Sequence, residues 1–331
     1  YKNESPDFLS LKAQYADYSV WQKKWLQSEL AEKQLAYWED QLADAPRNIN
    51  LPLDKKRPTF QSNKGDSFGF GIAEDDFEKL QALTQEAECT LFISTLAAFA
   101  VLLSRYSGDD EICIGTPMAN RTKSPFDALI GFFVNTAVLR IDLSGNPTFR
   151  DLLADVKQTV LKAFANQEYP FERLVEKLAP QRDTSQTPLF QVMFLFQNKT
   201  SEKLILDELE IEPIQTSADL STFDLTLGMH EGDFGLNGSF EYATDLFEGM
   251  TIGKMADHFS VLLSQIVKNP DLPVGNLQIL NADDQNKIVA NLNQTSGSFD
   301  YEKCLHDLVD VQCLASPENI CIVDRGRTIT Y

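Results

Sequence analysis

The sequence has little positive charge. Lys and Arg total 29 against 49 Asp and Glu, which gives a formal net charge of -20 over 331 residues. A surface of this sign repels the phosphates of nucleic acids and of anionic lipids at long range. We therefore expect neither nucleic acid nor a membrane as a partner.

A hydrophobic run of membrane-spanning length is also lacking. The longest strongly apolar stretch, Leu91 to Leu103, is interrupted by Ser94 and Thr95 and is shorter than the about 20 residues that a bilayer requires. Thr90 just before it is a suitable N-cap, and Gly108 suits a left-handed helix end. These residues predict a buried helix from Leu91 to Tyr106.

Cysteine and histidine are scarce, with five and three residues. The cysteines are odd in number, show no CxxC spacing and follow no secretory leader, which favours a reducing, cytoplasmic location. Cys304, His306 and Cys313 lack the paired short spacings of structural zinc sites, so we expect no metal site. The three histidines lie far apart in the sequence, and a Ser-His-Asp triad built from them would be conjecture.

Motifs of self-contained chemistry are missing as well. The sequence has no phosphate-binding P-loop, no dinucleotide fingerprint and no nucleophile elbow. What it does have is an alternation of strand and helix patterns, which predicts an α/β fold with a mixed sheet covered by helices. Strands are expected at 68–72, 111–116, 132–143 and 189–197, a hairpin at 223–229 and 236–242, and the main later helices at 149–164 and 250–267.

One strand pattern contains a polar interruption. Leu129 to Leu143 reads as a buried strand, yet Asn135 and Thr136 lie in its middle. An amide without partners in an apolar interior costs about 1–3 kcal/mol. Asn135 is therefore either a core amide with satisfied hydrogen bonds or a residue that faces a polar cavity. Alternation along a strand would place it on one face with Phe133 and Ala137.

Several phrases, taken in order, resemble one family. They are YADYSVWQ (Tyr15 to Gln22), IGTPMANR (Ile114 to Arg121), LIGFFVNTAVLR (Leu129 to Arg140), QEYPFERLVEKLAPQRDTSQTPLFQVMF (Gln167 to Phe194), and FDLTL with FEYATDLF. With these, residues 15 to about 280 resemble the carboxyl-terminal part of a nonribosomal peptide synthetase condensation domain. The resemblance implies a two-lobed fold like that of chloramphenicol acetyltransferase, incomplete here because the amino-terminal lobe is largely missing.

The resemblance also implies a reaction. A condensation domain forms an amide when an acceptor amine attacks a donor thioester, and phosphopantetheine on partner carrier domains holds both substrates. This chain itself is expected to bind no cofactor. The HHxxxDG motif of the family, whose second histidine is the proposed base or positioning group, is absent from these residues. We therefore expect no catalytic residue in this chain and no activity from it alone.

Four residues are candidates for lining the channel or supporting the motif. Arg121 is either a surface residue or, by resemblance, a partner of the missing motif's aspartate, for which a guanidinium fork is well shaped. Asn135 and Thr136 are expected where the family's strand approaches the reaction channel. Asp224 is either an anchor of the hairpin or a channel residue.

The end of the chain resembles a different domain. HDLVDVQCLASPENICIVDRGRTITY, from His306 to Tyr331, looks like the opening of an adenylation domain. We expect a condensation part at 1–270, a linker with one small helix at 271–301, and the start of an adenylation domain at 302–331. The expected partners are carrier domains, the adjacent adenylation domain and the missing amino-terminal lobe.

Two alternatives stay open at this point. If the HHxxxDG motif is degenerate in the parent protein, the chain would belong to a scaffold that docks carrier domains without catalysis. It could also belong to a related epimerisation or cyclisation domain, or to a free-standing acyltransferase. The phrase GFFVNT and the adenylation-like end favour an ordinary condensation domain.

Overall fold

The structure is a computed structural model that describes residues 11–179, 183–197, 219–232, 235–291, 293–294, 297 and 304–331. The chain divides into two compact units, Tyr1–Asn281 and Ala282–Tyr331, and each is described by itself. The division at residue 281 lies inside the range 271–301 that we expect to be a linker.

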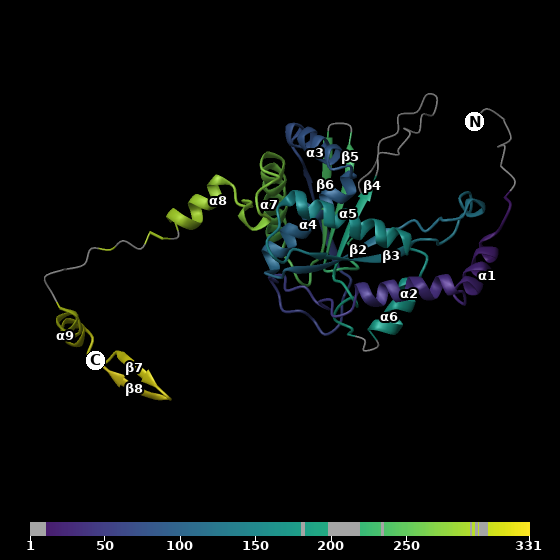
Figure 1. The fold of residues 1–331 in the computed structure, drawn as a ribbon. Coiled ribbons are helices and arrows are strands. Elements are labelled where there is room, and N and C mark those ends of the chain that lie inside the picture. Colours follow the sequence, from purple (N-terminus) through teal and green to yellow (C-terminus); the bar gives the residue numbers. More distant parts are fainter. Residues whose placement is uncertain are drawn as a thin grey trace, which may run out of the picture. The chain divides into compact units, whose positions relative to one another are not determined.

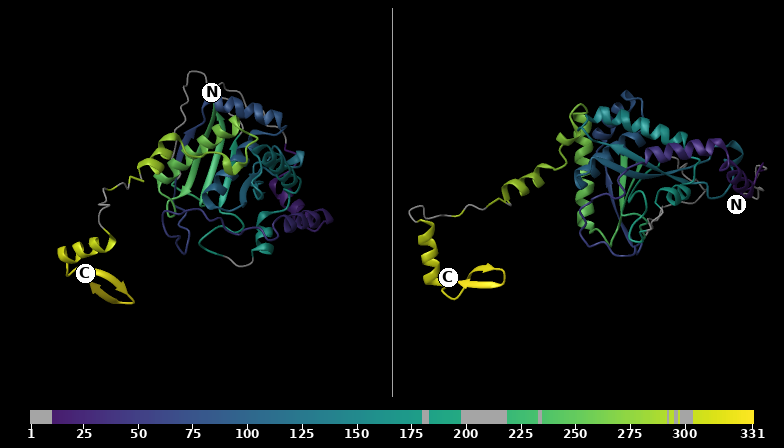
Figure 2. Two further views of the ribbon diagram at one scale, coloured as in Figure 1. Left: turned by 60° about the vertical axis from the view of Figure 1, so that its left-hand side comes forward. Right: turned by 60° about the horizontal axis from the view of Figure 1, so that its bottom comes forward.

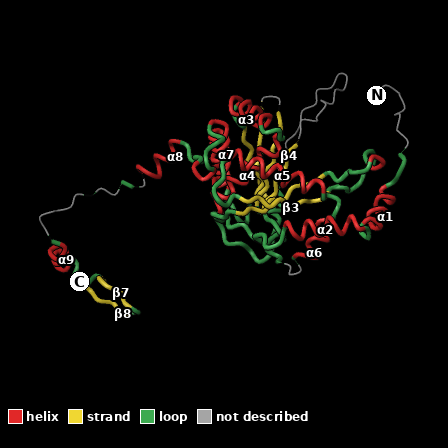
Figure 3. The backbone as a smooth tube through the Cα atoms, viewed as in Figure 1, coloured by secondary structure: helices red, strands yellow, loops and turns green. Residues whose placement is uncertain are grey.

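A six-stranded sheet forms the centre of the described part of the first unit (Figures 1 and 3). Its order is β1-β6-β5-β4-β2-β3. β4 is parallel to β2 and to β5, and the other neighbours are antiparallel, so the predicted mixed sheet is confirmed. The strands are β1 (Gly65–Gly71), β2 (Glu111–Met118), β3 (Asn135–Asp142), β4 (Val192–Gln197), β5 (Leu225–Gly232) and β6 (Gly235–Ala243).

Helices cover this sheet. α7 packs along β1 and β6, α4 along β2 and α5 along β3, while α3 contacts both α4 and α7 (Figure 2). α6 lies against α2 and β3. The helices are α1 (Tyr15–Trp25), α2 (Glu29–Gln41), α3 (Glu74–Glu86), α4 (Leu91–Ser107), α5 (Phe149–Ala165), α6 (Phe171–Leu178) and α7 (Gly249–Lys268), with 3₁₀ turns η1 (Ser124–Phe126) and η2 (Val274–Asn276).

The predicted buried helix is α4. The Thr90 side chain accepts a hydrogen bond from the Ile93 backbone N–H, and Gly108 ends the helix with a φ of 76°. The hydroxyls that interrupt its apolar run have partners inside the protein: Thr95 Oγ1 donates to the Leu91 carbonyl at 2.5 Å, and Ser94 Oγ lies 2.7 Å from Thr84 Oγ1. Within the described residues, no single helix is long and apolar enough to cross a bilayer.

Apolar side chains gather in two clusters. The large cluster fills the space between the sheet and its helices and includes the fully buried Phe99, Phe194, Phe240 and Phe259. A side chain of this kind stabilises the fold by about 1.5–3 kcal/mol when it is fully buried. The small cluster consists of Tyr18, Phe126, Leu129 and Phe133 and joins α1 to the segment 124–133. We call it the aromatic cluster.

The predicted strand at 132–143 is wrong at its beginning. β3 starts at Asn135, because β2 ends at Met118, the register partner of Asn135, and offers no partner to earlier residues. Leu129 and Phe133 are buried in the aromatic cluster instead, whereas Ile130 is 97% exposed and Phe132 75%. Asn135 therefore opens the strand, and the alternation expected to include Phe133 does not extend to it.

The second unit contains short elements. These are α8 (Ala282–Asn286), a π-helical turn (Lys287–Asn291), α9 (Leu305–Ala315) and a hairpin of β7 (Ile320–Asp324) and β8 (Arg327–Thr330). Arg325 and Gly326 turn the hairpin with φ values of 44° and 82°, as a two-residue turn requires. The helix followed by a β-rich segment agrees with the sequence pattern.

Candidate functional site

A groove lies at the carboxyl edge of the sheet. β2, β4 and β5 run in the same direction, so their carboxyl ends meet at one edge, where open α/β sheets bind their ligands. The first turn of α4 and the last turns of α5 close the sides of a cavity of about 800 Å³. Its lining residues on the strands are Thr116, Pro117, Met118, Leu195, Phe196, Gln197 and Glu231, and elsewhere Thr90, Leu91, Phe92, Ile93, Ala119, Val160, Leu161, Phe164 and Gln167. We call it the carboxyl-edge groove.

The groove lining is mainly apolar. Its threonines are used within the fold, since Thr90 caps α4 and Thr116 Oγ1 donates to the Phe194 carbonyl at 3.0 Å. Gln167 and Gln197 contribute amides, and Glu231 is the single ionisable residue among the described residues of the lining. The described lining is therefore a largely apolar surface with one carboxyl group.

Asn135 holds the loop that joins α5 to α6. Its Nδ2 donates to the carbonyls of Gln167 at 2.8 Å and Tyr169 at 2.7 Å. Its Oδ1 accepts from the Phe171 N–H at 3.0 Å. Phe171 is the first residue of α6, and Pro170 before it provides no side-chain cap. Asn135 thus replaces the missing cap from a distant strand.

Helix α2 holds the same loop from another side. Trp38 Nε1 donates to the Asn166 carbonyl at 3.0 Å, and Gln34 Oε1 accepts from the Tyr169 N–H at 3.0 Å. Gln34 is only 4% exposed, so its amide depends on these loop partners. The loop carries Gln167, and the clamp from two sides fixes that wall of the carboxyl-edge groove.

A third contact to the loop comes from the segment after β2. Glu168 accepts a hydrogen bond from Thr122 Oγ1 and lies 3.5 Å from Lys123 Nζ. Its side chain is 10% exposed. A nearly buried carboxylate needs such partners, so these contacts secure the loop against the segment that carries Arg121.

Arg121 lies in that segment. Its Nη1 donates to the carbonyls of Phe126 at 2.5 Å and Asp127 at 3.2 Å, and the guanidinium stacks 4.2 Å from the centre of the Phe133 ring. Within the described residues it forms no ion pair. These contacts make Arg121 the support of the aromatic cluster and leave its remaining N–H groups for other partners.

Thr136 lies beside the groove without lining it. In the β2–β3 register Thr136 pairs with Pro117 and Asn135 with Met118, and both partners line the carboxyl-edge groove. Thr136 and Asn135 are partly buried. Asn135 and Thr136, which we predicted to lie near a channel, thus lie on the strand next to the groove-lining residues of β2.

Asp224 lies at the opposite edge of the sheet. Arg57 Nη1 donates to Oδ1 at 2.9 Å, and Nη2 bonds Oδ2, so the pair is bidentate. The side chain of Asp224 is 2% exposed and that of Arg57 22%, and hydrogen bonding to Asp224 raises the pKa of Arg57. The Asp224 N–H donates to the Gln191 carbonyl at 3.0 Å. This is the geometry of an anchor at the start of the β5–β6 hairpin.

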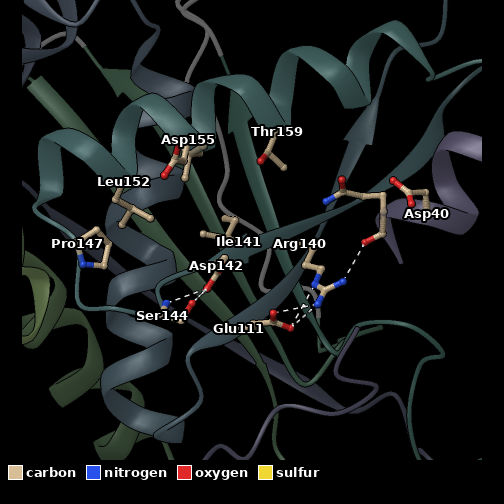
Figure 4. Close-up of a pocket in the computed structure, with 12 residues that line it drawn as sticks. Asp40, Glu111, Arg140, Ile141, Asp142, Ser144, Pro147, Leu152, Asp155 and Thr159 are labelled. Atoms are coloured by element: carbon tan, nitrogen blue, oxygen red, sulfur yellow. Dashed lines mark hydrogen bonds and ion pairs between the residues drawn. The ribbon is translucent and has the colours of Figure 1, made fainter. Parts of the chain in front are cut away.

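A second concavity lies between α5, β3 and the end of α2 (Figure 4). Four of its polar residues are paired with one another. Arg140 forms a bidentate pair with Glu111 at 2.7 and 2.9 Å, and the Asp142 carboxylate accepts from the Ser144 N–H and hydroxyl, which lowers the pKa of Asp142. None of the candidate residues lines it. We assign it a structural role in joining β2, β3 and α2.

Sequence reasoning missed four residues of these sites. Gln34 and Trp38 read as members of an amphipathic helix, and no local pattern indicates that they hold a loop 128–135 residues away. Arg57 belongs to the segment DKKRP, in which the sequence gives no reason to single out one of the three basic residues. Glu231 lies in a predicted hairpin. Among the described residues, no group of three or more His, Cys, Asp or Glu could hold a metal ion.

Comparison with protein families identifies the fold. Residues 1–289 match the family model described as "Condensation domain". The chain belongs to the condensation-domain family. Condensation domains of nonribosomal peptide synthetases form amide bonds, which agrees with the resemblance carried by the sequence phrases.

Curated relatives of this condensation domain are much longer proteins. Malpinin synthetase of Mortierella alpina is 39% identical over 328 residues, which cover 99% of this chain and 4% of the relative. Gramicidin S synthase 2 of Aneurinibacillus migulanus is 37% identical over 322 residues, covering 97% of this chain and 7% of the relative. The chain thus spans a small fraction of the relatives that it matches.

Solved structures share the fold. The X-domain of teicoplanin biosynthesis, in its complex with OxyB, superposes with a TM-score of 0.76 at 27% identity, over 85% of this chain and 64% of that chain. A four-domain nonribosomal peptide synthetase bound to AMP and glycine superposes with a TM-score of 0.74 at 26% identity, over 91% of this chain and 24% of that chain. The expected condensation-domain fold is therefore confirmed.

Proposed function

We propose that this chain is the carboxyl-terminal part of a condensation domain within a nonribosomal peptide synthetase. The match of residues 1–289 to the family is the observation that carries the proposal. The domain would be completed by an amino-terminal lobe with the HHxxxDG motif. The chain covers 64% of the X-domain's chain, which leaves room for such a lobe.

The proposed reaction is aminolysis of a thioester. The acceptor amine attacks the donor carbonyl carbon, the C–N bond forms, and the C–S bond breaks with release of a thiol. The amine loses one proton and the sulfur gains one, and the histidine of the amino-terminal lobe would position or carry that proton. Phosphopantetheine on carrier domains supplies the thioester linkage. The apolar lining of the carboxyl-edge groove would limit the access of water to a thioester held there.

Within this proposal the chain's residues have supporting roles. Arg121 keeps N–H groups beyond those used on the 126–127 carbonyls, and an aspartate of the amino-terminal lobe would be a suitable partner for them. Asn135 holds the loop beside the channel, Thr136 lies on the strand next to it, and Asp224 anchors the hairpin.

The proposed context is a multidomain protein in the cytoplasm. Carrier domains would deliver donor and acceptor, and an adenylation domain would begin at residue 302. The resemblance of His306 to Tyr331 to an adenylation opening supports that order. The net charge of -20 and the absence of CxxC spacing support the location and the lack of nucleic-acid partners.

The test compares the full-length synthetase with residues 1–331 alone. Both receive a loaded donor and an aminoacyl acceptor on carrier domains, and amide formation is measured by mass spectrometry. We expect product from the synthetase, loss of product when the second histidine of its HHxxxDG motif is replaced by Ala, and no product from the isolated chain. Rapid amide formation by the isolated chain would overturn the assignment of catalysis to the missing lobe.

A second candidate function is partner docking without catalysis. The likeness to an X-domain whose structure contains a bound OxyB favours it, because that protein uses this fold to bind another protein. The full-length protein separates the two functions: a degenerate HHxxxDG motif together with carrier-domain binding and no amide product would support docking.

A further inference from the structure

The chain that leaves α7 (Figure 1) is fastened to the first unit through its backbone. The Arg150 N–H donates to the Pro270 carbonyl at 3.1 Å, and the Val274 N–H donates to the Pro147 carbonyl at 2.9 Å. Pro147 and Arg150 lie at the start of α5, so the chain runs along the beginning of that helix. We call residues 270–279 the strap.

Arg105, in the last turn of α4, holds the strap from a second side. Its Nη1 donates to the Gly275 carbonyl at 2.6 Å and to the Leu277 carbonyl at 3.1 Å. The Gly275 N–H donates in turn to Asn146 Oδ1 at 2.7 Å. A Cβ at position 275 would lie only 2.8 Å from that oxygen, so a larger residue would displace either the Asn146 side chain or the strap.

Two side chains of the strap enter the core. Val274 is 5% exposed and Leu277 1%, and both belong to the large apolar cluster. Ile279 packs against that cluster and is partly buried, whereas α8, which follows the strap, has no buried residue. The strap therefore ends at Ile279, just before the boundary between the two units at residues 281 and 282.

We propose that the strap sets the point at which the second unit is tethered, and that Arg105 controls whether the strap is seated. With the strap seated, the connection to α9 starts after Ile279. With the strap released, it starts at the end of α7, and the ten residues 270–279 add up to about 35 Å of reach. Because effective concentration falls as a tether lengthens, the seated strap keeps the second unit at a higher effective concentration.

Release of the strap does not require the first unit to unfold. The strap contacts the end of α4 and the start of α5, and segments at the end of a compact unit open at a lower free energy than the whole unit. Arg105 is exposed, so its two contacts can break without disturbing the core. The inference goes beyond the proposed function and does not depend on it, because it involves neither amide formation nor the missing lobe.

Hydrogen exchange and small-angle X-ray scattering of the 331-residue chain test this inference. Arg105→Gln removes the fork that holds two carbonyls, and adding Gly275→Val forces the strap away from Asn146. In Arg105→Gln we expect the Val274 and Gly275 amides to exchange about 5-fold to 10-fold faster, with unchanged exchange in β4 and β5. In the double variant the radius of gyration should rise, because the tether is longer.

Arg173→Gln is the matched control, since it removes an exposed ion pair with Glu176 on α6 and should change neither measurement. Unchanged exchange at Val274 and Gly275 in both test variants would show that Arg105 does not hold the strap. Faster exchange throughout β4 and β5 would show that the strap opens only with the whole unit. An unchanged radius of gyration after release of the strap amides would exclude a change of reach. Amide formation by the full-length synthetase tests the proposed function separately.

Discussion

Two carboxylates at opposite ends of β5 have opposite environments. Asp224 precedes the strand, is 2% exposed and is held by a bidentate arginine. Glu231 lies near the other end, borders an open groove and has no side-chain partner among the described residues. The first is held by two hydrogen bonds within the fold, and the second makes no side-chain hydrogen bond to the described residues.

The comparison separates structural charge from functional charge. Removing one member of a buried pair leaves the other desolvated and unpaired, which is costly for folding. A carboxylate at a groove can be neutralised without such a loss, so its removal should affect binding more than stability. The same contrast applies to amides. The Asn135 side chain makes three hydrogen bonds to the backbone at 167–171, whereas the Gln197 side chain at the groove is exposed.

The largest effect should come from Asp224→Asn. Loss of the charge leaves Arg57 mostly buried without a counter-ion, and we expect a loss of about 3 kcal/mol in the free energy of unfolding. Since 1 kcal/mol shifts the Tm of a domain of this size by about 2–4 °C, the Tm should fall by about 6–12 °C. Thermal and denaturant unfolding of the 331-residue chain measure both quantities.

Asp75→Asn is the matched control for that change. Asp75 pairs with Lys79 on the surface of α3, where the side chains are 75% and 46% exposed. Such an exposed pair contributes little to stability. Equal destabilisation by the two variants would contradict the distinction between buried and exposed carboxylate pairs.

Asn135→Val should have the next largest effect. Two loop carbonyls and the Phe171 N–H lose their partner, and we expect a loss of about 2 kcal/mol in stability. In the full-length synthetase the loosened loop should also lower amide formation. Thr136→Val is the neighbouring control, since Thr136 makes no side-chain hydrogen bond to the described residues, and its Tm should stay within a degree or two of the parent. A stable Asn135→Val protein with normal turnover would contradict both the clamp and the channel role.

Arg121→Lys should have a smaller, local effect. A lysine cannot reproduce the stacked fork over Phe133 together with two carbonyl contacts, so the segment 124–133 should open more often. Hydrogen exchange of these amides should accelerate by about 3-fold to 10-fold, corresponding to about 1 kcal/mol. Arg173→Lys, at an exposed pair on α6, is the control. Unchanged exchange in Arg121→Lys would show that the aromatic cluster does not depend on its arginine.

The smallest effect concerns Glu241. Burial on β6 raises the pKa of this carboxyl above its ordinary value. Its charged form is therefore disfavoured in the folded state, and stability falls as pH rises from the ordinary pKa to the folded pKa. Glu241→Gln should raise the Tm at pH 7 by less than about 2 °C, and the gain should vanish at pH values below the ordinary carboxyl pKa. A gain that persists in acid would exclude this origin.

The sequence predicted the fold better than the contacts of the site. Period-2 and helical patterns identified the mixed sheet, the β5–β6 hairpin and α4 with its Thr90 and Gly108 ends, because these depend on local sequence. The start of β3 was misplaced since strand length depends on where β2 ends. Leu129 and Phe133 look like strand residues, but the aromatic cluster with Tyr18, distant in sequence, determines their position.

The candidate residues show the same limit. Asn135 was recognised as a polar residue that needs hydrogen-bond partners. Those partners lie in the α5–α6 loop, more than 30 residues away, and the residues around Asn135 do not indicate them. Arg121 and Asp224 were named without their actual contacts, since a carbonyl pair and Arg57 have no sequence signature. Glu231 became visible only with the groove around it.

The clamp on the α5–α6 loop has a consequence for synthesis on the ribosome. Gln34 is synthesised before its hydrogen-bond partner, because the Tyr169 N–H that it accepts from lies 135 positions later in the chain. Closing such a long separation is entropically expensive and slow compared with helix formation. The groove wall can therefore reach its native form only after α2, β3 and α5 have all emerged. Until then the amide of Gln34 remains exposed to water.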